Sequence, residues 1–226
     1  MLNAIEREVC DICDQAFSAR DRIMVLEAGC GSASHLEFKP AVDVVGIDNS
    51  VKQLERNTFL QKKILGDIQD YPLPRQAFDA VVCWWVLEHL ARPNDALVNL
   101  FGSVKQEGLL VLAFSNLLSA KGLVTKFTPF WFHVLFYRVM KFKSRPFPTY
   151  LRLAIMPGRV VRLAQSNGFS VLLFRLVEGT MTRRTITRSW LIGRTFSVVD
   201  FVIQMISFGR LGSLSLDSCV MVLRKD

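Results

Sequence analysis

The chain has 226 residues, half of them hydrophobic, which is the size of a single domain with one core. No segment offers about 18 consecutive apolar residues, which excludes a predicted membrane-spanning helix, and the acidic start of the sequence lacks the pattern of a signal peptide. We therefore expect one cytoplasmic domain over residues 1–226. Cys10 and Cys13 have CxxC spacing but no second pair, so the five cysteines predict reduced thiols and no metal site.

The formal charge of +8 is concentrated in two segments. Residues 1–115 carry 11 basic and 16 acidic side chains, whereas residues 116–156 carry 7 basic side chains and no acid. Residues 179–212 carry 5 basic side chains and the single acid Asp200. Both segments are also rich in aliphatic and aromatic residues, which favours an anionic membrane surface or an apolar partner over a solvated nucleic-acid groove. Nucleic acid is therefore not an expected partner.

Strand and helix patterns alternate along most of the chain. Strands are predicted over residues 22–29, 41–48, 62–67, 78–85, 108–115, 169–179 and 218–225. Helices are predicted over residues 3–18, 51–61 (opened by Ser50), 93–105 and 158–168, the last with Gly168 as its C-cap. This alternation predicts an α/β fold with a mostly parallel sheet and helices on both faces.

Two insertions, 116–156 and 179–212, interrupt this alternation. Each follows a strand of the parallel sheet, so both leave from the carboxyl edge, where such folds bind ligands, and we expect them to form a lid. A helix is predicted over 130–143, with Thr128 as N-cap, Pro129 as first residue and His133, Tyr137 and Lys141 on one side. Another is predicted over 190–209, ended by Gly209, with a polar stripe of Gly193, Ser197, Asp200 and Gln204. These apolar helices either pack on each other or across a homodimer, or lie on a membrane surface.

A glycine turn follows the first strand, in the sequence Glu27-Ala-Gly-Cys-Gly-Ser-Ala33. Its glycines let a ligand approach main-chain N–H groups closely. Ser34 stands where the dinucleotide pattern needs its last glycine, and Glu27 would repel a pyrophosphate. The turn therefore favours a cationic ligand without phosphate.

S-adenosylmethionine is such a ligand, and acids suited to it end the next two strands. Asp48 follows the second strand, where a carboxylate can bind a ribose diol. Asp67 and Ile68 follow the third strand and offer a polar contact beside an apolar wall for the adenine. The three sites lie in order along consecutive strands, and together they predict a cofactor site.

The segments 25–33 (VLEAGCGSA), 44–50 (VVGIDNS), 66–74 (GDIQDYPLP) and 78–97 (FDAVVCWWVLEHLARPNDAL) resemble those of class I S-adenosylmethionine-dependent methyltransferases, most closely the quinone-methylating group. The resemblance implies a Rossmann-like seven-stranded sheet with an antiparallel last strand. It also implies that Glu27, Gly29 and Gly31 contact the methionine part, Asp48 the ribose, and Asp67 with Ile68 the adenine. Cys30, Asn49 and Trp84 complete the expected cofactor-binding set, and Ala33 replaces a frequent third glycine.

The expected reaction is methyl transfer to an apolar or amphipathic small molecule such as a quinone, a polyketide or a lipid-like acceptor, with O-methylation preferred. Because the methyl group is already activated, the protein mainly aligns the reactants, and a base is needed only when the acceptor loses a proton. Candidate bases are His89, His133 and Tyr137. A catalytically silent protein that binds the cofactor and docks through its insertions remains the alternative.

Overall fold

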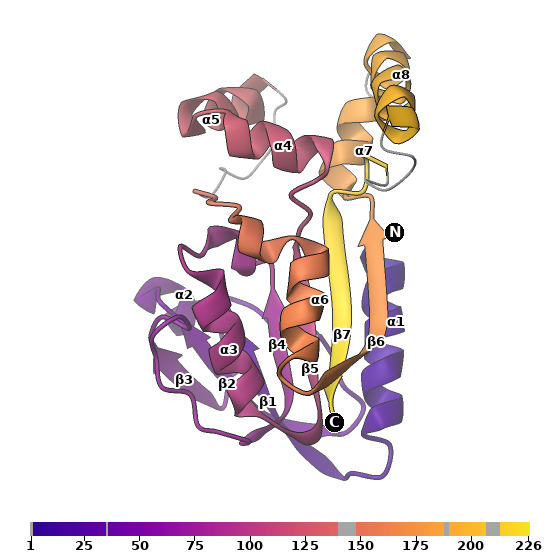
Figure 1. Ribbon diagram of the computed structural model, residues 1–226. Helices are drawn as coiled ribbons and strands as arrows, with labels where there is room; N and C mark the ends of the chain where they lie inside the picture. The colour runs from indigo at the N-terminus through magenta and orange to yellow at the C-terminus, as the bar shows by residue number, and fades with distance from the viewer. Residues whose placement is uncertain (1, 35, 140–147, 188–189, 207–212) are drawn as a thin grey trace.

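The computed structural model describes residues 2–34, 36–139, 148–187, 190–206 and 213–226. A seven-stranded sheet runs through the centre of the described chain (Figure 1), in the order β3-β2-β1-β4-β5-β7-β6. Its strands are β1 (Arg22–Ala28), β2 (Ala41–Asp48), β3 (Lys62–Leu65), β4 (Phe78–Trp84), β5 (Val104–Ser115), β6 (Phe169–Val177) and β7 (Ser218–Lys225). Strands β1 to β5 pair in parallel, and β7 is antiparallel to both β5 and β6. The predicted fold class and the antiparallel last strand are confirmed.

Helices cover both faces of the sheet. On one face α1 (Leu2–Ala16) packs Val9 and Cys13 against alternate strand residues such as Val25 and Val82. The opposite face is covered by α3 (Pro93–Ser103) and α6 (Pro157–Gln165), which lie side by side in front of the sheet in Figure 1. The central strands are therefore buried on both sides, as their continuous apolar runs require.

Several predicted helix ends are wrong. Helix α2 (Val51–Arg56) stops well before residue 61, because the buried Asn57 leaves the helical conformation and directs its side-chain amide towards the carbonyls of Cys30 and Gly31, both 3.4 Å away. Helix α3 ends at Ser103 because β5 begins at the next residue, Val104, and not at residue 108. Helix α6 is capped by Ser166, while Gly168 lies two residues further on with φ +77°.

The insertions extend beyond the carboxyl edge of the sheet as two separate pairs of helices (Figure 1). The first holds α4 (Ala120–Phe127) and α5 (Phe130–Val139), and the second holds α7 (Thr180–Thr187) and α8 (Trp190–Ile206). Helices α4 and α7 were not foreseen. No helix among the described residues is long and apolar enough to cross a membrane. The predicted helix parts after residue 139, with Lys141, and the predicted end at Gly209 lie outside the described residues.

The helix predicted from residue 130 is present, but Thr128 is not its N-cap and Pro129 is not part of it. Thr128 is the C-cap of α4, and its hydroxyl donates to the Val124 carbonyl at 2.6 Å, so α5 begins only at Phe130. In Figure 1, α5 and α8 stand apart, so the described helices do not pack on each other as the sequence allowed. Their role as a lid stays a prediction.

Asp217, just before β7, joins the two insertions to the sheet. Its buried carboxylate accepts hydrogen bonds from the Gly179 amide (2.7 Å) and the Thr182 hydroxyl (2.6 Å) at the start of the second insertion. Lys121 in α4 of the first insertion lies 3.7 Å from the same carboxylate. A single acid thus fixes where both insertions leave the carboxyl edge.

Candidate cofactor site

The glycine turn after β1 is held against β2 by backbone hydrogen bonds. The amides of Gly29 and Cys30 both donate to the Ile47 carbonyl, at 2.7 and 3.1 Å. Gly29 and Gly31 have φ values of +72° and +55°, a region that side chains with a Cβ rarely adopt. A Cβ at Gly29 would lie 2.4 Å from a methyl carbon of Val86, so the turn also packs closely on the segment after β4.

Asp48, at the end of β2, closes this turn from the neighbouring strand. One carboxylate oxygen accepts from the Gly31 amide at 2.9 Å, and the other accepts from the Ser50 amide at 2.8 Å. Asn49 beside it is exposed. The acid therefore orders both the turn and the start of α2. Its position in the sequence did not reveal this structural role, to which the predicted contact with a ribose would be added.

Glu27 is buried at the end of β1 and accepts a hydrogen bond from the Ser34 hydroxyl at 3.0 Å. Its carboxylate is thus joined to the loop that begins with the glycine turn, and its contact with the methionine part of the cofactor stays a prediction. Cys30 in the turn is also buried, and burial, with the nearby Asp48 and Glu27, raises the pKa of its thiol to about 12. The thiol stays protonated and serves as an apolar contact, not as a nucleophile.

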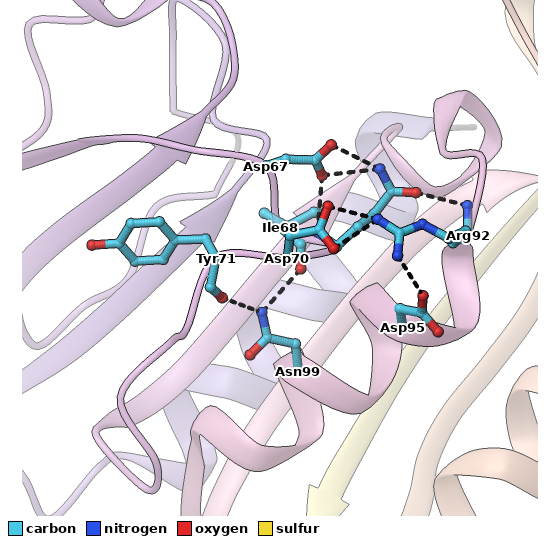
Figure 2. Close-up of polar contacts among 8 residues, drawn as sticks. Asp67, Ile68, Asp70, Tyr71, Arg92, Asp95 and Asn99 are labelled. Carbon is cyan, nitrogen blue, oxygen red and sulfur yellow. Dashed lines mark hydrogen bonds and ion pairs between the residues drawn. The ribbon is translucent and has the colours of Figure 1, made fainter.

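Asp67 and the residues after it form the third part of the site (Figure 2). The Gln69 side-chain amide donates to both carboxylate oxygens of Asp67, at 3.0 and 2.8 Å. The Ile68 side chain is buried in the core, and its carbonyl accepts from the Asn99 amide at 3.0 Å. Arg92 completes the network by donating to Asp70 and Asp95, as Figure 2 shows. The loop after β3 is thereby fastened to the beginning of α3.

The adenine contact predicted for this loop is consistent with the carboxylate of Asp67 more than with the side chain of Ile68. That side chain packs inward, which leaves the backbone as the part of Ile68 that a ligand could meet. Gln69 and Asn57, which hold the two loops of the site, were missed by sequence reasoning. The signal for Asn57 was present, since a polar residue ends the amphipathic pattern of α2.

Trp84 lies in the hydrophobic core on the α1 side of the sheet, together with Val82 and Leu36. Its predicted contact with the cofactor stays a prediction, since the side chain is buried. The next residue, Trp85, has φ +59° and donates its amide to the Ala113 carbonyl at 2.7 Å. A left-handed conformation at a bulky residue is strained, and such strain is common beside functional sites.

The three predicted bases occupy two different places. His89 lies in the short 3-10 helix η1 (Leu87–His89), and its Nδ1 is 2.7 Å from the Pro148 carbonyl. His133, in α5, has its Nε2 2.7 Å from the Thr128 hydroxyl, and Tyr137 lies one turn further along the same helix. Burial raises the pKa of Tyr137. Only His89 lies at the edge of the sheet that carries the glycine turn, and there it joins residue 148 to η1.

The described residues contain no group of three or more His, Cys, Asp or Glu side chains that could hold a metal ion. Two hollows lie away from the glycine turn. One, of about 700 Å³, is open and lies between α1 and the amino ends of β1 and β2, opposite the candidate site. The other, of about 370 Å³, lies in the second insertion, below α8.

Comparison with known proteins gives matches over the central part of the chain. Residues 26–112 match the sequence model of a methyltransferase domain. A tRNA U34 carboxymethyltransferase of Methylococcus capsulatus is 35% identical over 101 residues, which are 39% of this chain and 31% of that protein. The chain spans less than half the length of the curated relatives that it matches. These matches do not extend to the whole protein.

Solved structures share the fold over nearly the whole chain. The YcgJ protein of Bacillus subtilis aligns with a TM-score of 0.60 at 15% identity, covering 97% of this chain and 98% of that one. An S-adenosylmethionine-dependent methyltransferase from Mesorhizobium loti aligns with a TM-score of 0.53 at 13% identity, covering 90% and 91%. At such low identity the likeness concerns the fold alone.

Proposed function

We propose that this chain, whose residues 26–112 match the sequence model of a methyltransferase domain, is a class I S-adenosylmethionine-dependent methyltransferase that transfers methyl groups to an apolar or amphipathic small molecule at a membrane surface. The observation that carries the proposal is the row of acids at one edge of the sheet. Glu27 and Asp48 lie at the carboxyl ends of β1 and β2, and Asp67 lies just after β3; these three strands are adjacent in the order of the sheet. Three carboxylates in a row favour a cationic nucleoside over a phosphate-bearing one.

The residues of this edge fit S-adenosylmethionine. Gly29 and Gly31 have positive φ values, so the turn keeps a conformation that exposes main-chain groups and that residues with a Cβ rarely adopt, and the buried carboxylate of Glu27 suits an ammonium group. Asp48 is held by the two amides to which it is bonded, so it is oriented before a ribose arrives. When bound, the cofactor supplies a methyl group on a sulfonium centre, and the protein's own residues hold the reactants in line and exclude water.

The apolar acceptor is inferred from the outer faces of the insertions. In α8 most of the polar stripe faces inward, although Ser197 is exposed. Asp200 accepts hydrogen bonds from Gln204 within the helix and from Ser213 and Leu214 in the loop before β7. A Cβ at Gly193 would lie 3.0 Å from the Ile186 carbonyl of α7, so this side of α8 is also closely packed.

The apolar side chains of α8 consequently face outward. Phe201 is 65% exposed, and Val198, Met205 and Ile206 are exposed with it. A helix on a water-facing surface normally has the reverse arrangement, with its apolar stripe turned to the core. This inversion favours an apolar environment outside α8, as a lipid-like acceptor or a membrane would provide.

The first insertion has the same character with basic groups added. Phe127 is 79% exposed and Trp131 is 66% exposed, and the exposed Lys126 and Arg138 belong to the same pair of helices. Residues 116–156 contain no acid that would oppose an anionic surface. Aromatic and basic side chains on short helices are typical of segments that lie in a membrane interface.

The reaction is tested with the full chain, labelled S-adenosylmethionine and a bacterial lipid extract. We expect the label to enter the organic phase, because the acceptor is apolar, while an RNA sample stays unlabelled. Binding of the cofactor by calorimetry without label in any fraction would favour the catalytically silent alternative. Label in RNA alone would contradict the proposed acceptor class, and a loss of both binding and transfer would contradict the cofactor site.

The membrane surface is tested by sedimentation with vesicles that contain phosphatidylglycerol. Replacing Trp131 and Phe201 by Ser is expected to weaken binding about tenfold or more, since each removes a large apolar side chain from the interface. Replacing Lys126 and Arg138 by Gln should weaken vesicle binding similarly, because each basic group near an anionic surface contributes about 1 kcal/mol. Raised salt should reduce the difference between this variant and the parent, since it screens that attraction.

A matched control replaces two exposed apolar side chains far from the insertions. Phe59, 62% exposed in the loop before β3, and Val98, exposed on α3, become Ser. We expect vesicle binding of this variant to equal that of the parent. The contrary outcome is a parent that fails to sediment with vesicles and forms a dimer in light scattering. If the Trp131 and Phe201 replacements dissociate that dimer, this surface belongs to a homodimer interface.

A further inference from the structure

Glu88 is a buried acid for which the fold supplies only part of the hydrogen bonding. It lies in η1, immediately beyond β4, and is 4% exposed. Its Oε1 accepts from the Ser115 hydroxyl at 3.0 Å. Its Oε2 is enclosed and has no hydrogen-bond partner. It is the one buried side-chain polar atom of the described residues in this state. Buried polar atoms are rarely left in this state without a functional reason.

The position of Glu88 places it next to the cofactor turn. Val86, two residues earlier, packs so closely on Gly29 that a Cβ there would clash with it. Ser115 ends β5, the neighbour of β4 on the side away from β1. The three acids of the cofactor edge lie at or just after the carboxyl ends of β1, β2 and β3, so Glu88 stands over the adjoining half of the carboxyl edge.

The same half of the edge is where an acceptor would be enclosed. The Glu88 carbonyl accepts from the amides of Tyr150 and Leu151, at 2.9 and 3.2 Å, which brings the end of the first insertion over η1. The first insertion also begins here, one residue after Ser115. Glu88 is thus bordered by the cofactor turn on one side and by the insertion on the other.

The charge of Glu88 is sensitive to what lies beside it. Burial raises the pKa of its carboxyl. Four nearby groups lower that pKa in part; in decreasing order they are its own backbone amide, His89, the Ser115 hydroxyl and Lys121 of α4. The Cys83 thiol of β4 faces the same acid, and burial raises the pKa of that thiol too, so it stays uncharged. Lys121 is shared with Asp217. A cation brought to this place would therefore promote the ionised form of Glu88.

We propose that Glu88 is a catalytic residue, whose Oε2 takes the proton from a hydroxyl group of the methyl acceptor, and this proposal rests on the proposed methyl transfer. In the step the acceptor oxygen forms a bond to the methyl carbon, the bond from that carbon to sulfur breaks, and the O–H proton moves to Oε2. The sulfonium becomes a neutral thioether as the carboxylate becomes a neutral acid. The pair of charges present before transfer is gone after it, which suits a buried site.

The other candidate bases are less suited to this step. His89 holds the Pro148 carbonyl through Nδ1 and His133 holds the Thr128 hydroxyl through Nε2, and neither ring is an enclosed acid with an oxygen left for the acceptor, as Glu88 is. Tyr137 has a raised pKa, which makes its phenol a weaker acid and keeps it protonated at neutral pH. Glu88 also selects the acceptor chemistry: a hydroxyl that loses a proton needs this group, whereas an acceptor without such a proton does not.

The first test is independent of turnover and of the acceptor. The binding of S-adenosylmethionine and of S-adenosylhomocysteine to the full chain is measured by calorimetry near pH 6, in two buffers with different enthalpies of ionisation. The difference between the binding enthalpies in the two buffers gives the number of protons released. We expect proton release with the cationic sulfonium compound and little with the neutral thioether, because only the cation ionises Glu88. Glu88→Gln should abolish the difference while the affinity for either compound changes less than about fivefold.

Glu107→Gln is the matched control, since Glu107 is an exposed acid at the amino end of β5. It should release the same number of protons as the parent. Equal proton release by Glu88→Gln and the parent would overturn the proposal while leaving the cofactor site intact. If neither compound binds the parent, it is the proposed function that fails.

The second test follows label transfer from S-adenosylmethionine to the lipid extract. Glu88→Gln should lower kcat by about 100-fold or more with little change in KM for the cofactor, the usual effect of losing a general base. Glu88→Asp should recover part of the rate, and the parent's loss of rate at acid pH should be absent from Glu88→Gln. A kcat within threefold of the parent in folded Glu88→Gln would overturn the proposal.

Discussion

Gly29→Ala is expected to lower the free energy of unfolding by about 2–4 kcal/mol. Two costs combine at this residue. The backbone has φ +72°, where a Cβ is strained, and the new Cβ would lie 2.4 Å from a methyl carbon of Val86. Urea denaturation followed by circular dichroism measures the loss, and the affinity for S-adenosylmethionine should fall with it because the turn must shift.

Gly168→Ala separates these two costs. Gly168 has φ +77°, almost the value at Gly29, but nothing lies within 4 Å of a Cβ built there. Its replacement should therefore cost only the backbone strain, about 1 kcal/mol. The double variant Gly29→Ala with Val86→Ala should recover part of the loss relative to the sum of the single changes. Equal effects of Gly29→Ala and Gly168→Ala would refute the close contact with Val86.

Asp48→Ala is expected to weaken the binding of S-adenosylmethionine and S-adenosylhomocysteine about 100-fold or more. The change removes the acceptor for two backbone amides, Gly31 and Ser50, and it removes the carboxylate proposed for the ribose. Charge-assisted hydrogen bonds of this kind contribute about 1.5–3 kcal/mol each, and tenfold in affinity corresponds to about 1.4 kcal/mol. Calorimetry with both compounds measures the effect.

Asp43→Ala provides the comparison on the same strand. Asp43 also lies in β2, but its carboxylate pairs with Arg22 in an exposed salt bridge away from the glycine turn. Cofactor affinity should stay unchanged, because exposed ion pairs contribute little and this one touches no part of the site. Unchanged affinity in Asp48→Ala would remove both the ribose assignment and the role of this acid in the turn.

The insertions illustrate where local patterns mislead. Residues 190–206 were predicted to be helical, and α8 is, but the pattern alone left open which face would be covered. The structure turns most of the polar stripe inward, because Asp200 accepts from the Leu214 amide and the Ser213 hydroxyl, residues that lie beyond the described end of α8. Helices α4 and α7 were also missed, because contacts with a residue distant along the chain hold them. Asp217 accepts a hydrogen bond from Thr182 of α7 and pairs with Lys121 of α4.

The amino-acid sequence by itself determined the order of the strands along the chain, the glycine turn and the three acids of the cofactor edge. These features depend on local apolar runs and on the rule that parallel strands carry their ligands at their carboxyl ends. Only the tertiary structure decided that Asp48 would hold the turn and that Asn57 would end α2. It alone also enclosed Glu88 with one oxygen unpaired, since burial and hydrogen bonding depend on residues that meet only after folding.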